Sequence, residues 1–139
     1  MKEITKHMIK NFRIMKLGYD FMGYKVDRKE SLSFHHLVIA KKDCRDLGYG
    51  KGYYQWNGAI LVQNTSHDYL HTIERIDRDV FLYITSRMIE ENKLERLDIG
   101  QLRLIRDALI YFEREHKCDR NSKGKPCIKE EYISKRLIL

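Results

Sequence analysis

The stretch that decides the fold is residues 56–71, WNGAILVQNTSHDYLH. Its first part, residues 56–62, has the apolar and β-favouring composition of a strand. Its second part begins a helix, for which Ser66 can provide the N-terminal cap. His67 and His71 are four positions apart on this helix, so their rings project from one face, one turn apart. The stretch therefore predicts a strand-to-helix unit that offers two imidazoles to one metal ion.

A second pair of histidines lies upstream, in SFHHLVIAKK at residues 33–42. Its apolar side chains predict a strand over residues 31–40. His35 and His36 are adjacent in the middle of this strand, where neighbouring side chains point to opposite faces. Both can serve one site only if the strand twists or ends there, so we expect irregular geometry at this point.

These residues resemble the HNH nucleases, also called the ββα-metal or His-Me finger family. The match covers about residues 31–75 and consists of FHHL on the first strand, the Asn57 of WNGAIL and HDYLH on the helix. It is most similar to the HH…N…HxxxH variant of small phage and bacterial proteins. The resemblance implies an α+β fold with a ββα-metal core of two short strands and a metal-binding helix, elaborated by N- and C-terminal helices.

The resemblance also implies roles for five residues. His35, His67 and His71 would bind a divalent metal ion (Zn, Ni, Mn or Mg), His36 would be the general base, and Asn57 would orient the base or its loop. The chemistry is compatible with these roles, because an unperturbed histidine titrates near ~6.5 and accepts a proton at neutral pH. Imidazole ligands favour transition metals over Mg.

Two assignments have alternatives that the sequence leaves open. Asn64 is a possible substitute for Asn57, and either residue can simply belong to a turn. Asp68 can orient a histidine ring by bonding to the ring nitrogen that does not bind the metal, or it can be an acidic residue in the first turn of a helix.

The connection between the two strands departs from the family pattern. Many members have a short Gly-Gly loop and paired CxxC motifs, whereas this chain has DCRDLGYGKGYYQW at residues 43–56 and no CxxC. This segment is either a mobile loop that contacts nucleic acid or an ordinary glycine-rich connection. The contacting side chains would be Tyr49, Lys51, Tyr53 and Tyr54. Trp56 is expected in the core.

Apolar spacing predicts the remaining elements of one domain, residues 1–139. They are a helix over 2–16 with Ile4, Met8, Phe12 and Met15 on one face, a short strand around Tyr24 and Val26, a helix starting at Asp77 or Asp79 with Phe81, Ile84 and Met88 on one face, a helix over 99–117 with Leu102, Ile105, Leu109 and Phe112 buried, and a last helix over 127–136.

Positive charge is concentrated at the two ends of the chain. The net charge of +7 divides into +4 for residues 1–30, −1 for residues 31–102 and +4 for residues 103–139. The basic helical flanks, residues 1–30 and 99–139, suit a polyanionic partner such as double-stranded DNA. A surface that is positive only for solubility is the alternative.

Other features bear on the compartment. Three scattered cysteines indicate reduced thiols, the charged N-terminus lacks the apolar stretch of a signal peptide, and no apolar run reaches membrane-spanning length. We expect a cytoplasmic protein of a bacterial or phage-infected cell, not a membrane protein.

The resulting prediction is a metal-dependent endonuclease that hydrolyses phosphodiester bonds in DNA. RNA is not excluded as the polymer. The alternative is a phage-type protein with this fold that acts by binding a protein partner, such as an inhibitor of a host defence nuclease or a regulator.

Overall fold

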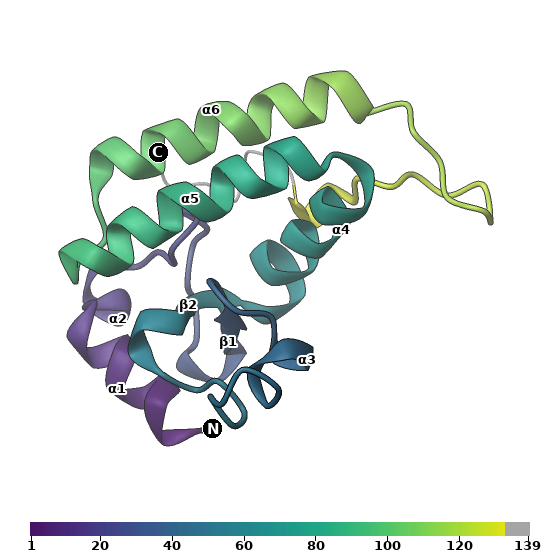
Figure 1. The fold of residues 1–139 in the computed structure, drawn as a ribbon. Helices are drawn as coiled ribbons and strands as arrows, with labels where there is room; N and C mark the ends of the chain where they lie inside the picture. Colours follow the sequence, from purple (N-terminus) through teal and green to yellow (C-terminus); the bar gives the residue numbers. More distant parts are fainter. Residues whose placement is uncertain (133–139) are drawn as a thin grey trace.

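The computed structural model describes residues 1–132. Within them it has six α-helices and one two-stranded antiparallel sheet, which confirms the predicted α+β class. The elements are α1 (Glu3–Asn11), α2 (Ile14–Leu17), β1 (Leu32–His36), α3 (Lys41–Cys44), β2 (Gly58–Val62), α4 (Asp68–Ile76), α5 (Arg78–Leu94) and α6 (Ile99–His116). Figure 1 shows α5 and α6 running side by side above the sheet, with α1 and α2 on one side of it and α4 on the other.

Both strands are shorter than predicted. β1 ends at His36. Leu37 N still donates to the backbone oxygen of Asn57 at 2.8 Å, but Val38 N and Ile39 N donate to the Asn57 side chain at 3.0 and 2.7 Å and not to a strand. β2 begins at Gly58, because residues 55–57 form a 3₁₀ turn. In the antiparallel register His35 is opposite Ala59, and His36 is opposite Gly58. The pairing therefore ends at the histidine pair.

The N-terminal helix is broken, contrary to the prediction of one helix over residues 2–16. Arg13 has φ 55° and separates α1 from α2. Phe12 and Ile14 are both fully buried, although side chains two positions apart on a straight helix face different directions. The left-handed residue between them lets both reach the core, while Met15 is left exposed.

Other predicted boundaries are corrected as follows. The short strand near Tyr24 is a single bridge between Tyr19 and Lys25. Asp77 starts α5, since its side chain accepts a hydrogen bond from Val80 N at 3.2 Å. The last predicted helix, 127–136, is a 3₁₀ turn over Glu130–Tyr132 in the part that is described, and residues 133–136 lie outside it.

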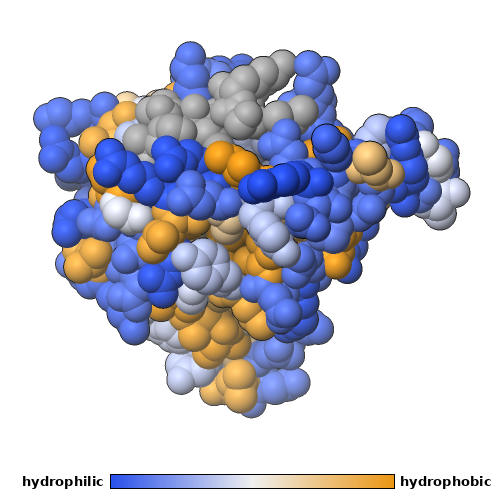
Figure 2. All heavy atoms as spheres, turned by 90° about the horizontal axis from the view of Figure 1, so that it is seen from above, coloured by the Kyte–Doolittle hydropathy of each residue, from blue (hydrophilic) through white to orange (hydrophobic). Residues whose placement is uncertain are grey.

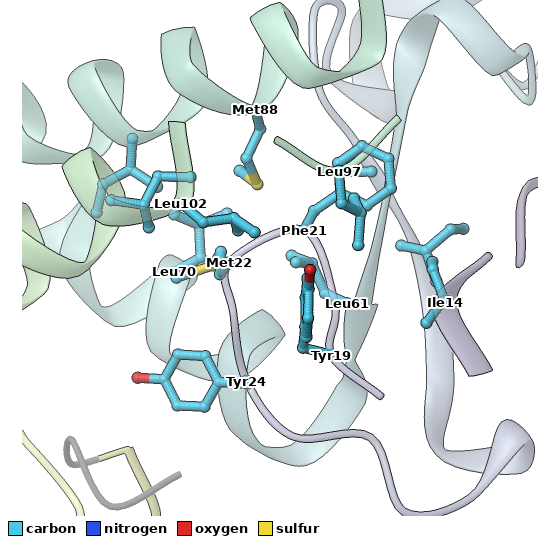
Figure 3. Packing of buried hydrophobic residues seen from close by; sticks show 14 of the residues in the cluster. Ile14, Tyr19, Phe21, Met22, Tyr24, Leu61, Leu70, Met88, Leu97 and Leu102 are labelled. Atoms are coloured by element: carbon cyan, nitrogen blue, oxygen red, sulfur yellow. The ribbon is translucent and has the colours of Figure 1, made fainter. Parts of the chain in front are cut away.

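The core joins the N-terminal loop, the sheet and the upper helices. Figure 3 shows side chains of residues 19–24, strand β2 and helices α4 to α6 pointing into one region. The predicted stripe of α6 is buried, as are Ile84 and Met88 of α5. The face seen in Figure 2 is mainly hydrophilic, with apolar atoms in small groups between polar ones. None of the helices formed by residues 1–132 has the length and apolar character to cross a membrane.

Asp20 is a fully buried carboxylate that connects the N-terminal loop to the end of β2. Its Oδ1 accepts from Met22 N and Tyr24 N at 2.9 and 3.0 Å, and its Oδ2 accepts from Val62 N at 2.9 Å and from the Ser66 hydroxyl. Burial raises the pKa of Asp20, and these hydrogen bonds act in the opposite direction. The prediction that Ser66 caps a helix is therefore wrong. Its hydroxyl instead fixes the turn of residues 63–67, which contains His67.

Glu91 is a buried carboxyl group at the junction of α5 and α6. Its Oε1 accepts from Asp98 N at 3.1 Å, while Oε2 has no hydrogen-bond partner in residues 1–132. Burial raises the pKa of Glu91 from 4.5 to about 9. The folded protein therefore keeps Glu91 protonated at neutral pH. The free energy of unfolding decreases as pH rises from 4.5 to about 9, because the unfolded chain releases the proton of Glu91 in this range and the folded chain does not.

Glu91→Gln should remove this pH dependence, because glutamine resembles the protonated acid and cannot ionise. Between pH 4.5 and about 9, the unfolding free energy of wild type relative to the variant should fall by up to about 1.4 kcal/mol per pH unit. Urea unfolding at several pH values measures it. Glu90→Gln is the matched control, since the Glu90 side chain is 43% exposed. Parallel curves for wild type and Glu91→Gln would contradict the buried titration.

Candidate metal centre

Three histidines, from β1, from the turn before α4 and from α4 itself, come together beside the end of the sheet. His35 of β1 is buried, His67 precedes α4 and His71 is one turn further along the same helix. Each offers one nitrogen, and these three atoms lie within 4.8 Å of one another. The ring of His35 is 5.2 Å from that of His67 and 5.6 Å from that of His71. His35, His67 and His71 are thus close enough to hold one metal ion.

Neighbouring polar groups orient two of these rings. Ser33 Oγ lies 2.8 Å from His67 Nδ1 and 3.4 Å from Leu61 O. The hydroxyl can therefore donate to the carbonyl and accept from Nδ1–H, which leaves the lone pair on Nε2. His71 Nδ1 lies 3.6 Å from Glu74 Oε1, so its Nε2 is directed away from the carboxylate. A hydrogen bond such as the one with Ser33 fixes the tautomer of a metal-binding histidine, whereas the 3.6 Å contact with Glu74 is too long to do so.

The sequence alone did not identify Ser33 and Glu74 as these partners. Asp68, the residue considered for this role, is exposed, and its charge acts only to raise the pKa of His67 against larger opposing effects. A helical spacing of three residues between His71 and Glu74 was a signal in the sequence that could have been used.

The protonation states of the rings suit a metal ion. Burial, with smaller effects of the three neighbouring histidines, lowers the pKa of His35 to about 3. Burial and the nearby His71 lower the pKa of His67 to about 4. His35 Nε2 is buried and has no hydrogen-bond partner among residues 1–132. A neutral ring with an unpartnered nitrogen at the centre of the cluster is the condition that a metal ligand must meet.

His36 lies on the other face of β1, in contact with the rings of Phe34 and Tyr53 at 5.1 Å each. Its Nε2 is 2.8 Å from the carbonyl oxygen of Lys51. A carbonyl only accepts, so Nε2 carries the proton in the neutral ring and Nδ1 has the lone pair. Because β1 ends at His36, both His35 and His36 line one cavity of about 760 Å³ in spite of their opposite directions.

Asn57 is buried and holds the loop between the strands. Its Oδ1 accepts from Val38 N and Ile39 N, and its Nδ2 donates to Ile39 O and Gly52 O, both at 3.1 Å. The carbonyl that binds His36 belongs to Lys51, the neighbour of Gly52. Asn57 thus positions the backbone around His36, whereas Asn64 lies exposed in the turn before α4.

Gly52 of this loop is packed closely against Cys44, Asn57 and His36. It has φ +76°, and a Cβ atom there would clash with the Cys44 sulfur and lie 3.1 Å from both Asn57 Nδ2 and His36 Cδ2. Gly48 has a similar φ of +87° but open space around it. An alanine at either position would therefore have a similar backbone strain, but only the alanine at position 52 would also clash with neighbouring side chains.

Gly52→Ala should destabilise the protein by about 1–3 kcal/mol more than Gly48→Ala, because the added methyl group clashes with the Cys44 sulfur and crowds His36 and Asn57. The backbone cost of a left-handed alanine, about 1–2 kcal/mol, should be common to both variants. Thermal unfolding of the two variants measures the difference. Equal melting temperatures would show that Gly52 is not packed tightly against the Cys44 sulfur and the His36 ring.

The loop also presents an aromatic cluster formed by Tyr49, Tyr54 and Trp56. The Tyr54 and Trp56 rings stack with centroids 5.7 Å apart, and Tyr49 meets the edge of this pair. Trp56 is 43% exposed, so its predicted place in the core is wrong. Its backbone is held instead, since Asn92 Nδ2 donates to the carbonyls of Gln55 and Gly58.

Residues 63–67 form a wide π-helical turn between β2 and α4. The sequence predicted a helix that begins at His67 with Ser66 as its cap, whereas α4 begins at Asp68 and residues 63–67 form this turn. The Ser66 hydroxyl bonds with Val62 and with the buried Asp20 carboxylate inside this turn. The turn, held in this way, delivers His67 to His35, and single π turns occur frequently at functional sites.

A search of family models finds no match for this chain, and no curated protein or solved structure is significantly similar to it.

Proposed function

We propose that the chain is a metal-dependent endonuclease of the HNH, or ββα-metal, type, which hydrolyses phosphodiester bonds in nucleic acid, with DNA as the expected polymer. One observation carries the proposal. A cluster of three histidines suited to a metal ion lines the same cavity as a separate histidine, His36, whose neutral ring has its lone pair on Nδ1. Hydrolysis of a phosphodiester needs both a centre for the phosphate charge and a base for water.

In this proposal His35, His67 and His71 hold the ion through neutral imidazoles. When bound, a divalent ion such as Zn, Ni or Mn supplies positive charge for the phosphate oxygens and the leaving oxygen. The fit rests on the buried, unpartnered His35 Nε2 and on the Ser33 hydroxyl, whose hydrogen bond with Nδ1 of His67 leaves Nε2 of that ring for the ion.

His36 acts on the water. Its Nδ1 accepts one proton as the water oxygen attacks phosphorus, and the bond from phosphorus to the leaving oxygen breaks. The leaving oxygen takes a proton from solvent. Lys51 O stabilises the imidazolium that forms, since its contact with Nε2–H strengthens when the ring gains charge. Asn57 keeps this carbonyl in place through Gly52.

Positive groups near the site suit an anionic backbone. The ammonium groups of Lys2 and Lys41 lie 4.4 and 5.8 Å from the centre of the Tyr53 ring, which contacts His36. Further away, the hairpin after α6 projects from the body of the molecule (Figure 1) and carries Arg120, Lys123 and Lys125. Such groups attract phosphates irrespective of sequence.

The test is a cleavage assay with supercoiled plasmid and with a circular single strand, in Zn, Ni, Mn or Mg and in chelator. Nicking or linearisation that needs the metal would support the proposal. Intact DNA in every metal would contradict it and would favour the alternative, a protein that keeps the histidine centre and acts by binding another protein.

A further inference from the structure

The cavity that contains the histidines continues along one face of α5. Arg78, Phe81, Leu82, Thr85 and Ile89 line it, and their spacings of three and four residues place them on a single stripe of the helix. Leu37 and Val38, just after β1, line the same cavity. The cavity is thus lined by imidazoles, by the guanidinium of Arg78, which lies 3.9 Å from the Glu74 carboxylate, by the Asp43 carboxylate, and by aliphatic and aromatic side chains.

Thr85 is an unusual member of this wall. The residue is 8% exposed, and its Oγ1 has no hydrogen-bond partner in residues 1–132. Buried hydroxyl groups are nearly always paired, because an unpaired one loses the hydrogen bonds that it makes with water. Thr85 and His35 both line the cavity, so a ligand there can pair with the buried Thr85 Oγ1 or His35 Nε2 once a side-chain movement uncovers that atom.

A phosphate group alone does not match this space. It suits the histidines and Arg78, but it makes no favourable contact with Phe81, Leu82 or Ile89. A nucleotide matches both parts, since its base has apolar faces and an edge with donors and acceptors for a hydroxyl. In a duplex these faces are stacked and the Watson–Crick edge is paired, so a base reaches such a pocket only from an unpaired strand or after flipping.

We propose that the α5 side of the cavity is a base-binding subsite and that the substrate is an unpaired strand. This inference rests on the proposed function and specifies its substrate class. The exposed aromatic cluster of Tyr49, Tyr54 and Trp56 supports it, because successive unpaired bases stack on exposed aromatic rings without regard to sequence.

Binding to a short fluorescent single strand and to the duplex of the same sequence tests the subsite. His36→Ala protein is used so that the nucleic acid survives, and anisotropy is measured with metal present. The single strand should bind at least about tenfold more tightly than the duplex, because only its bases can enter the cavity.

Variants of the wall sharpen the test. Thr85→Val keeps the shape without the hydroxyl and should weaken strand binding about three- to tenfold, whereas Thr85→Ser keeps the hydroxyl and should bind like the parent. Leu82→Trp should narrow the cavity and weaken binding more strongly. Leu104→Trp on α6 is its control, since Leu82 and Leu104 are both exposed, at 48% and 38%, and only Leu82 lines the cavity.

Thermal unfolding separates a local effect from misfolding. Thr85→Val should raise the melting temperature, since it removes an unpaired buried hydroxyl, so weaker binding by a more stable protein marks a ligand contact. Equal affinity for strand and duplex, or unaltered strand affinity in both Thr85→Val and Leu82→Trp, would overturn the subsite. If the subsite is overturned, metal-dependent cutting of plasmid would still support the nuclease proposal. Strand binding through this cavity without any cleavage would refute the nuclease proposal and leave the base-binding subsite standing.

Discussion

His36→Ala should lower the rate of metal-dependent cleavage at least about a hundredfold, because it removes the group proposed to accept the proton of water. Metal affinity should remain close to that of wild type, since His36 lies on the other face of β1 from the three-histidine cluster and packs against Phe34 and Tyr53. Plasmid nicking at saturating metal measures the rate, and calorimetric titration with Zn or Ni measures the affinity.

Two further variants control this result. His36→Gln retains an N–H that can donate to Lys51 O but has no basic nitrogen, so it should be as inactive as the alanine variant. His7→Ala removes an exposed histidine of α1 and should cut like wild type. Cleavage by the glutamine variant at the wild-type rate would show that His36 only anchors the loop and that the base is another group.

His71→Ala should weaken metal binding by at least about tenfold and reduce cleavage accordingly, because the centre would keep only two of its three nitrogens. The His71 side chain is 54% exposed, so its loss should not disturb the core. His67→Ala should have the same direction of effect. Calorimetry with Zn or Ni measures the affinities directly.

The stabilising effect of the metal gives an independent measure. A ligand at about 100 times its Kd stabilises the folded state by about 2.7 kcal/mol, so Zn should raise the melting temperature of wild type more than that of His71→Ala. His116→Ala is the matched control, since His116 lies on α6 and pairs with Asp119 at 2.8 Å. If both ligand variants bind metal like wild type, the HxxxH pair has a structural role only.

The helical pair of the three-histidine cluster could be predicted because its signal is local, whereas the addition of His35 to the pair came from the resemblance to the HNH nucleases. The spacing of His67 and His71 depends only on helix geometry, and the composition around His35 marks a strand. The α6 stripe was predictable for the same reason. In a long segment, the regular spacing of apolar residues is enough to predict a helix and its buried face.

The support around the histidines could not be predicted in this way. Lys51 contributes a backbone carbonyl, which any residue at that position would offer. Asn57 bonds with backbone groups of residues 38, 39 and 52, and Asp20 bonds with the end of β2 from 42 residues away. Such pairings have no periodicity, so only the folded chain shows which polar side chains become buried connectors.

Trp56 failed as a core prediction for a related reason. Large aromatic residues are usually buried, and nothing in the segment shows that its backbone is held by Asn92 while its ring faces out. The break at Arg13 is similar, since the burial of both Phe12 and Ile14 requires a kink that helical spacing alone does not indicate.

The exposed position of Trp56 also makes the loop optically visible. It is the chain's single tryptophan, it stacks on Tyr54, and the next residue, Asn57, fixes the backbone around His36. Its emission therefore comes from one known place, two residues from the start of β2, and a change in its intensity or wavelength reports on this loop alone. The protein thus contains an intrinsic fluorophore beside its candidate site, which allows stopped-flow measurement of ligand arrival without any attached dye.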